Sequence, residues 1–177
     1  MKARHTIQAL VRDRPGVLQR IAGLFSRRGY NIESLTVGTA EEEGLSRMTI
    51  VARCDERTRD QMVLQLGKLI EVVRATPLAP GTFVSRELML IKLGVAPEER
   101  PAITALAETF RCGVVDVGAD MLVVQAVGDV DKNEALLRLL RGYRLIELSR
   151  TGETAMRRSG AEPSAADAPS ESRDRWV

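Results

Sequence analysis

Few residues of this chain belong to the types that enzymes use as nucleophiles, bases or metal ligands. His5 is the only histidine, and neither of the two cysteines, Cys54 and Cys112, has a histidine nearby in the sequence. Thiol catalysis needs a base beside the cysteine, and a structural zinc site needs four cysteine or histidine ligands. The acidic run at residues 41–43 is typical of a solvated turn. We therefore expect no catalytic residue and no metal site, and we expect His5 to be an ordinary surface residue.

One segment, Asp13-Arg14-Pro15-Gly16, has the chemistry of a ligand-binding loop because it precedes an apolar helical pattern. The first N–H groups of a helix lack intrahelical partners and carry a partial positive charge. The amides of Gly16, Val17 and Leu18 would therefore cradle a carboxylate, and Gly16 has no Cβ to obstruct it. Asp13 would accept hydrogen bonds from an ammonium group. A free α-amino acid carries both groups.

The same tetrapeptide also fits a purely structural role. Pro15 suits the first helical position, and Asp13 or Arg14 stands where a helix cap belongs. Asn31, at the start of the next predicted strand, offers both a donor and an acceptor. Its amide either holds a turn or reaches the same ligand, within one protomer or across a dimer interface.

The elements that must position these residues follow one β-α-β-β-α-β pattern twice. In the first copy, alternation predicts strands at residues 5–11, 31–38, 45–53 and 70–76, and apolar spacing predicts helices after Pro15 and at residues 56–68. Residues 77–81 are predicted to be a linker. The second copy has predicted strands at 88–95, 114–117, 121–127 and 145–149, with helices after Pro97 and around residues 136–140.

This order predicts an α+β fold with two ferredoxin-like domains, residues 4–78 and 83–152, followed by a disordered tail, residues 153–177. The tail is predicted to be disordered because it is poor in apolar residues. Each domain holds about 70 residues, which is marginal for a hydrophobic core. Pairing of the open sheets with another chain is therefore expected.

Composition excludes several classes of protein. Hydrophobic residues make up 44%, charged residues 28% and aromatic residues 3%, and the net charge is +2. The absence of a long apolar run argues against a membrane span, and the N-terminus lacks the features of a signal peptide. The small net charge and scarce aromatic residues argue against a nucleic-acid partner. We expect a cytoplasmic protein.

Two sets of residues carry a family resemblance. Residues 13–18, Asp-Arg-Pro-Gly-Val-Leu, resemble the ligand loop of ACT domains, which are small amino-acid-sensing modules. Residues 24–37 and 45–50 resemble, more specifically, the regulatory small subunits of acetolactate synthase, also called acetohydroxyacid synthase. The resemblance covers about residues 3–158 and implies an N-terminal ACT domain followed by the C-terminal domain of that family.

The resemblance implies a regulatory role without catalysis. In that family the large subunit holds thiamine diphosphate, Mg2+ and FAD, and the small subunit needs no cofactor of its own. The small subunit forms a homodimer through its ACT domains, activates the large subunit and confers feedback inhibition by valine in branched-chain amino-acid synthesis. Carried over by motif, the residues expected to bind valine are Asp13, Gly16, Val17 and Leu18 of one protomer, with Asn31 and Ile32 of the other.

Three other functions compete with this one. A free-standing amino-acid sensor would act on another enzyme, and the long matches at residues 24–37 and 45–50 argue against it. A metal-responsive DNA regulator would need several His or Cys ligands, whereas the second half has only Cys112. An autonomous enzyme lacks its nucleophile–base pair. The preference among valine, leucine and isoleucine is open, because one methylene changes affinity by only about 1–3 kcal/mol.

Overall fold

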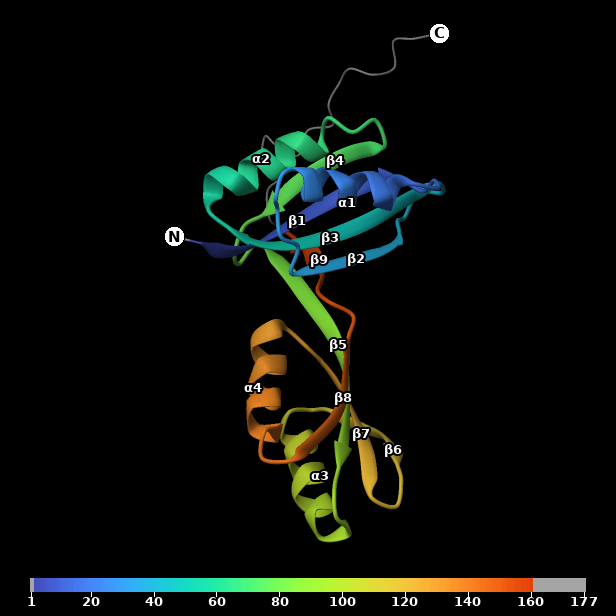
Figure 1. Ribbon diagram of the computed structural model, residues 1–177, viewed down its shortest axis with the longest axis vertical. Coiled ribbons are helices and arrows are strands. Elements are labelled where there is room, and N and C mark those ends of the chain that lie inside the picture. The colour runs from blue at the N-terminus through green and yellow to red at the C-terminus, as the bar shows by residue number, and fades with distance from the viewer. Residues whose placement is uncertain (1, 161–177) are drawn as a thin grey trace. The chain divides into compact units, whose positions relative to one another are not determined.

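The structure is a computed structural model that describes residues 2–160. The described residues divide into two compact units, the first built from residues 2–84 together with residues 154–160, the second from Ser85–Glu153. Each unit has the order β-α-β-β-α-β (Figure 1), so the prediction of two ferredoxin-like domains is confirmed. Within the described residues, no helix has the length and apolar character needed to cross a membrane.

The first unit is a four-stranded antiparallel sheet covered on one face by two helices. Its strands follow the order β2-β3-β1-β4. Its elements are β1 (Ala3–Arg12), α1 (Val17–Arg27), β2 (Ser34–Thr39), β3 (Leu45–Cys54), α2 (Glu56–Leu66), β4 (Val72–Leu78) and β9 (Thr154–Arg157).

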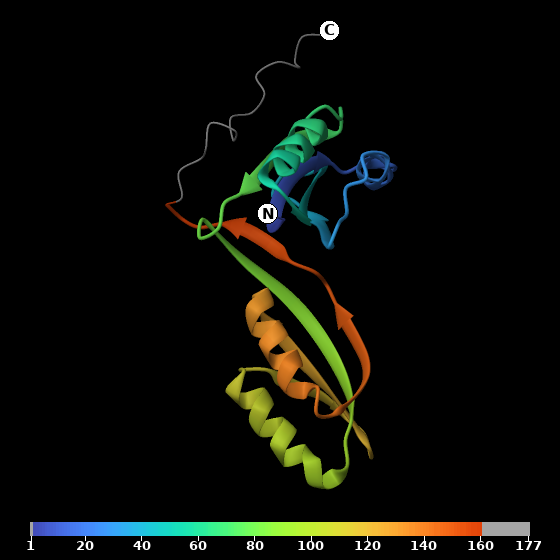
Figure 2. The same ribbon diagram turned by 60° about the vertical axis from the view of Figure 1, so that its left-hand side comes forward.

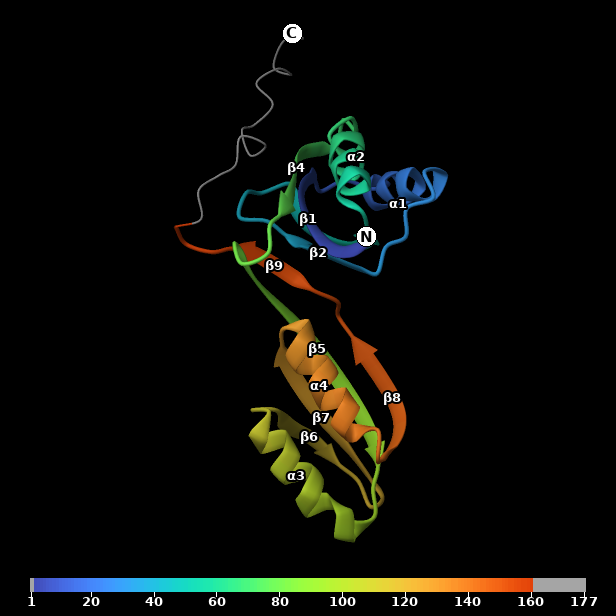
Figure 3. The same cartoon turned by 90° about the vertical axis from the view of Figure 1, so that its left-hand side faces the viewer.

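Period-two alternation decides which face of this sheet is covered. Ile7 and Ala9 of β1 and Met48 and Ile50 of β3 are almost fully buried beneath the helices, where Phe25 of α1 fills the centre of the core. Residues at the intervening positions point to the opposite face. Figure 3 shows α1 and α2 on one side of the sheet and β9 on the other.

The second unit repeats this architecture with strand order β6-β7-β5-β8, and its helices lie on one face of the sheet (Figure 2). Strand β9 also pairs with β5. Its core is formed mainly by Met89, Ile91 and Leu93 of β5 with apolar residues of the neighbouring elements. Its elements are β5 (Phe83–Gly94), a 3-10 turn (Pro97–Glu99), α3 (Arg100–Thr109), β6 (Gly113–Val117), β7 (Met121–Gly128), α4 (Val130–Leu140) and β8 (Arg144–Arg150).

Two sequence predictions about connections are wrong. The predicted linker at 77–81 contains the last two residues of β4, because Pro77 is tolerated in an edge strand opposite Ile7. The predicted tail begins too early, because Thr154–Arg157 form β9. The apolar pattern gave no sign of β9, since Ala155 is its only fully buried residue. The rest of that tail, residues 161–177, lies outside the described residues.

Candidate functional site

The loop between β1 and α1 enters the helix through a glycine in the left-handed region. Gly16 is the N-cap of α1 with φ of 87°, and no side chain caps the helix. A Cβ built on Gly16 would meet no atom within 4 Å, so the space in front of the helix start is open. The expectation that Asp13 or Arg14 caps the helix and that Pro15 is its first residue is therefore wrong, because Gly16 takes the cap position.

Backbone hydrogen bonds hold this loop from two sides. The Arg12 N–H donates to the Glu71 carbonyl at 2.8 Å, and the Asp13 N–H donates to the Gly44 carbonyl at 2.7 Å. Gly44 ends the turn between β2 and β3 with φ of 78°. The loop is thus placed by the β2–β3 turn on one side and by the segment preceding β4 on the other.

The predicted site residues of this loop play different structural parts. Asp13 and Gly16 are exposed, whereas the Val17 side chain is 6% exposed and packs in the core. Val17 therefore offers only its backbone to a ligand. The Leu18 side chain is 50% exposed, which gives the open space an apolar neighbour.

Asn31 and Ile32 lie beyond the other end of α1. Asn31 is exposed, and Ile32 is half-buried against the core. The preceding Tyr30 packs edge-on against Phe25 with ring centroids 5.7 Å apart. A helix of 11 residues is about 16 Å long, so one protomer does not bring Asn31 to the start of α1.

The sequence prediction missed an ion pair beside the loop. Arg20, in the first turn of α1, pairs with Glu71, whose side chain is only 12% exposed. A cation near a helix N-terminus opposes the helix dipole, so a carboxylate partner is favourable there. The basic residue was visible in the sequence, but its partner 51 residues away was not.

The described residues contain no group of three or more His, Cys, Asp or Glu side chains placed to hold a metal ion. Cys54 and Cys112 are free thiols, and burial raises the pKa of each. His5 is half-buried on β1 and its Nε2 atom is enclosed without a hydrogen-bond partner, which differs from the predicted surface residue. These groups offer no paired nucleophile and base. The absence of a cofactor and of a metal remains a prediction.

Both units match known protein families. Residues 7–74 match the family described as the AHAS small subunit-like ACT domain, and residues 86–159 match the family described as the small subunit of acetolactate synthase. The two matches together cover most of the described residues.

Individual relatives agree with these families. A probable acetolactate synthase small subunit of Methanothermobacter thermautotrophicus is 50% identical over 155 residues, which cover 87% of this chain and 92% of the relative. The acetolactate synthase small subunit of Bacillus subtilis is 46% identical over 86% of this chain and 89% of its own length. The crystal structure of the Thermotoga maritima small subunit matches with a TM-score of 0.83 and 40% identity, covering 89% of this chain and 98% of that one. This chain therefore belongs to the family of acetolactate synthase small subunits, the regulatory subunits of that enzyme.

Proposed function

We propose that this chain activates the catalytic large subunit of acetolactate synthase and makes it sensitive to inhibition by valine. The observation that carries the proposal is the start of α1, where a glycine cap with positive φ leaves open space in front of a helix that no side chain caps. Helix N-termini of this kind favour carboxylates. The Asp13 side chain would receive the ammonium group, and the exposed Leu18 would contact the branched side chain.

The second half of the site would come from a second copy of the chain. Because α1 is about 16 Å long and Asn31 and Ile32 lie beyond its far end, a single amino acid contacts both ends of α1 only if two protomers meet. Strand β2 is an edge of the first sheet, and edge strands invite pairing with another chain. A homodimer through the ACT domains would supply both halves.

The chemistry would belong to the large subunit. We expect thiamine diphosphate, Mg2+ and FAD to be bound there, with pyruvate as the substrate and this subunit as the cytoplasmic regulator of branched-chain amino-acid synthesis. This chain would contribute the effector site and the contact that raises turnover.

Calorimetric titration of the purified chain with valine, leucine and isoleucine tests the proposal. Valine is expected to bind in a ratio that corresponds to sites shared within a dimer, and the same amino acid is expected to inhibit the reconstituted enzyme. A folded chain that binds none of the three amino acids would contradict the proposal.

A further inference from the structure

A short return segment lies on the face of the first sheet that the helices leave open. Residues 154–158, here called the strap, comprise β9 and Arg158. The Ala155 N–H donates to Thr49 Oγ1 at 3.3 Å, and the Ala155 carbonyl accepts a hydrogen bond from Gln8 Nε2 at 2.9 Å. The Arg158 N–H donates to the Thr82 carbonyl at 2.9 Å. The strap therefore docks on β1 and β3 as well as beside the start of β5.

Of the five residues of the strap, only Ala155 is fully buried. Ala155 is 3% exposed, but the next residue, Met156, is 65% exposed. β9 pairs with β5, and its hydrogen bonds to the first sheet come from the side chains of Gln8 and Thr49. Segments with few buried apolar contacts are those that open locally while the rest of a domain stays folded.

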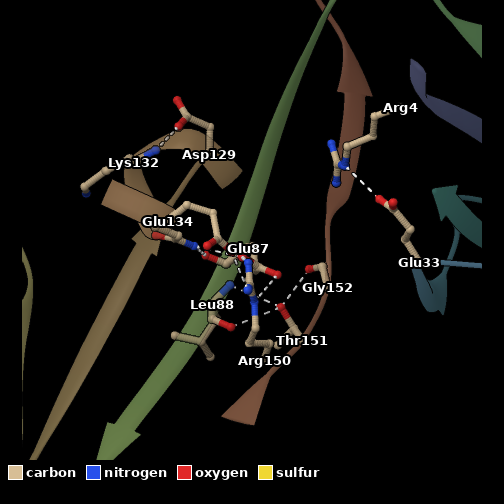
Figure 4. A network of polar contacts seen from close by, with 11 residues as sticks. Arg4, Glu33, Glu87, Leu88, Asp129, Lys132, Glu134, Arg150, Thr151 and Gly152 are labelled. Atoms are coloured by element: carbon tan, nitrogen blue, oxygen red, sulfur yellow. Dashed lines mark hydrogen bonds and ion pairs between the residues drawn. The ribbon is translucent and has the colours of Figure 1, made fainter. Parts of the chain in front are cut away.

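The residues just before the strap are held by an ion pair whose carboxylate is buried. Arg150, the last residue of β8, donates to both carboxylate oxygens of Glu87, at 3.0 and 2.7 Å. The Glu87 side chain is 6% exposed and also accepts from Asn133 Nδ2 at 3.1 Å. Figure 4 shows this cluster with Thr151 and Gly152 beside it. Gly152 has φ of 83°, so this ion pair is followed by a glycine turn and then by the strap.

The strap is linked to the loop before α1 by consecutive hydrogen bonds. Gln8, which donates to Ala155, accepts at its Oε1 from Arg47 Nη1 at 3.1 Å. Arg47 Nη2 donates to both carboxylate oxygens of Glu41 at 2.7 Å, and this bond holds the pKa of Glu41 below its ordinary value. Glu41 lies in the β2–β3 turn, whose Gly44 carbonyl accepts the Asp13 N–H.

Strand β1 provides a second connection, because it carries Gln8 and leads directly into Asp13. A change at Gln8 would therefore reach the same loop through the strand backbone and through the Arg47–Glu41 pair. Coupling of this kind requires an element with two arrangements that both ends can bias. A strap that is either docked or released would be such an element.

We propose that the strap, residues 154–158, detaches reversibly from the first sheet. Its docking, relayed by Gln8, Arg47 and Glu41, sets the geometry of the loop at Asp13. The regulatory consequence, a change in sensitivity to the effector, rests on the proposed function. The structural consequence, a change in the loop at Asp13, does not depend on the proposed function.

Hydrogen exchange on the full chain tests whether the strap detaches. In the wild type, the amides of residues 155–158 are expected to exchange at least tenfold faster than the core amides of β1 and β3. Ala155→Glu, which places a charge in the buried position, is expected to speed their exchange at least another tenfold while the core amides change by less than threefold. Met156→Glu is the matched control because that side chain is exposed. Exchange of the strap together with the core would overturn the proposal, since the strap would then be an integral strand.

The relay is tested at the Asp13 amide and in the holoenzyme. Gln8→Met keeps the length of the side chain but removes both hydrogen bonds, and Gln61→Met on the exposed face of α2 is its control. Ala155→Glu and Gln8→Met are each expected to speed exchange of the Asp13 amide at least fivefold and to shift the midpoint of valine inhibition at least threefold in the same direction. An Asp13 amide that does not respond would overturn the relay.

The remaining outcomes separate the relay from the proposed function. A responsive Asp13 amide with an unchanged inhibition midpoint would overturn the regulatory consequence alone. A wild-type holoenzyme that no branched-chain amino acid inhibits would contradict the proposed function, and the Asp13 amide would still decide whether the relay exists.

Discussion

At the scale of single residues, Gly16 carries the strongest constraint on the proposed site. Its φ of 87° lies in the left-handed region, which costs most L-residues roughly 1–2 kcal/mol. Asparagine and aspartate tolerate that region better than other residues. A substitution here must therefore be chosen so that backbone strain and charge can be separated.

Gly16→Asp is expected to make the enzyme resistant to valine. The new carboxylate would face that of the ligand, and like charges about 4 Å apart repel by roughly 1 kcal/mol in water and about 4 kcal/mol near a protein surface. Since 1.4 kcal/mol is about tenfold in affinity, valine binding should weaken by about ten- to a thousandfold. The measurements are a valine inhibition curve on the reconstituted enzyme and circular dichroism of the subunit.

Gly16→Asn is the matched control, because it has the same shape and backbone preference without the charge. It is expected to weaken binding less than Gly16→Asp does. Equal effects of the two variants would point to steric blocking instead of charge. A folded Gly16→Asp subunit with an unchanged inhibition midpoint would place the effector elsewhere.

The two cysteines are expected to react slowly in the native protein. Burial raises the pKa of the Cys54 and Cys112 thiols, so even less thiolate is present at neutral pH than in a free cysteine. Because the folded state favours the protonated thiols, their contribution to stability is present below the ordinary thiol pKa and is lost as the pH rises through the raised values. Alkylation at pH 7.5, followed by mass spectrometry, should label both cysteines much faster in denaturant than without it. Rapid labelling of the folded chain would contradict the burial of these thiols.

At the scale of elements, truncations separate β9 from the residues that follow it. Removal of residues 161–177 is expected to change neither the melting temperature nor valine inhibition, because that segment is poor in apolar side chains. Removal of residues 153–177 also deletes β9 and the two hydrogen bonds of Ala155, which contribute about 0.5–1.5 kcal/mol each to the free energy of unfolding. One kcal/mol shifts the melting temperature of a small domain by roughly 4–8 °C, so a drop of several degrees should appear in calorimetry. Equal melting temperatures of the two truncations would show that β9 does not stabilise the first unit.

At the scale of the whole molecule, the chain alone is expected to form no acetolactate. It offers no paired nucleophile and base among the described residues, and its relatives are small subunits. The assay supplies pyruvate, thiamine diphosphate, Mg2+ and FAD, with and without the large subunit. Turnover of the large subunit should rise when this chain is added. Product from this chain by itself would contradict the proposed function.

Mixed dimers test whether the site is shared between protomers. Asn31→Ala is expected to weaken valine binding by about 1–3 kcal/mol through a lost hydrogen bond. In a dimer that combines one Gly16→Asp chain with one Asn31→Ala chain, one of the two shared sites keeps both native residues. Titration should therefore recover about half of the wild-type sites in the mixed dimer and none of them in a Gly16→Asp homodimer. If each chain held a complete site, the mixed dimer would instead bind at one site weakened only by Asn31→Ala.

The local pattern of the sequence determined most of the fold. Alternation of Ile7, Ala9 and Val11 marked the covered face of β1, and helical spacing marked the buried side of α1 at Ile21 and Phe25. These patterns are readable because burial of apolar side chains follows the period of each element. The glycine at position 16 likewise marked the open helix start from the sequence, although the residue that caps the helix was assigned two or three positions too early.

Only the tertiary structure decided the contacts between distant segments. The pairing of Arg20 with Glu71, the bond from Gln8 to Ala155 and the bond from Asp13 to Gly44 each join elements that no local period relates. Strand β9 escaped the sequence pattern because only one of its residues, Ala155, is fully buried and its partners lie on β1, β3 and β5, far away in the sequence. Side-chain hydrogen bonds specify partners only after the sheet has brought them within about 3 Å, so the sequence by itself determines the elements and the tertiary fold determines how they are coupled.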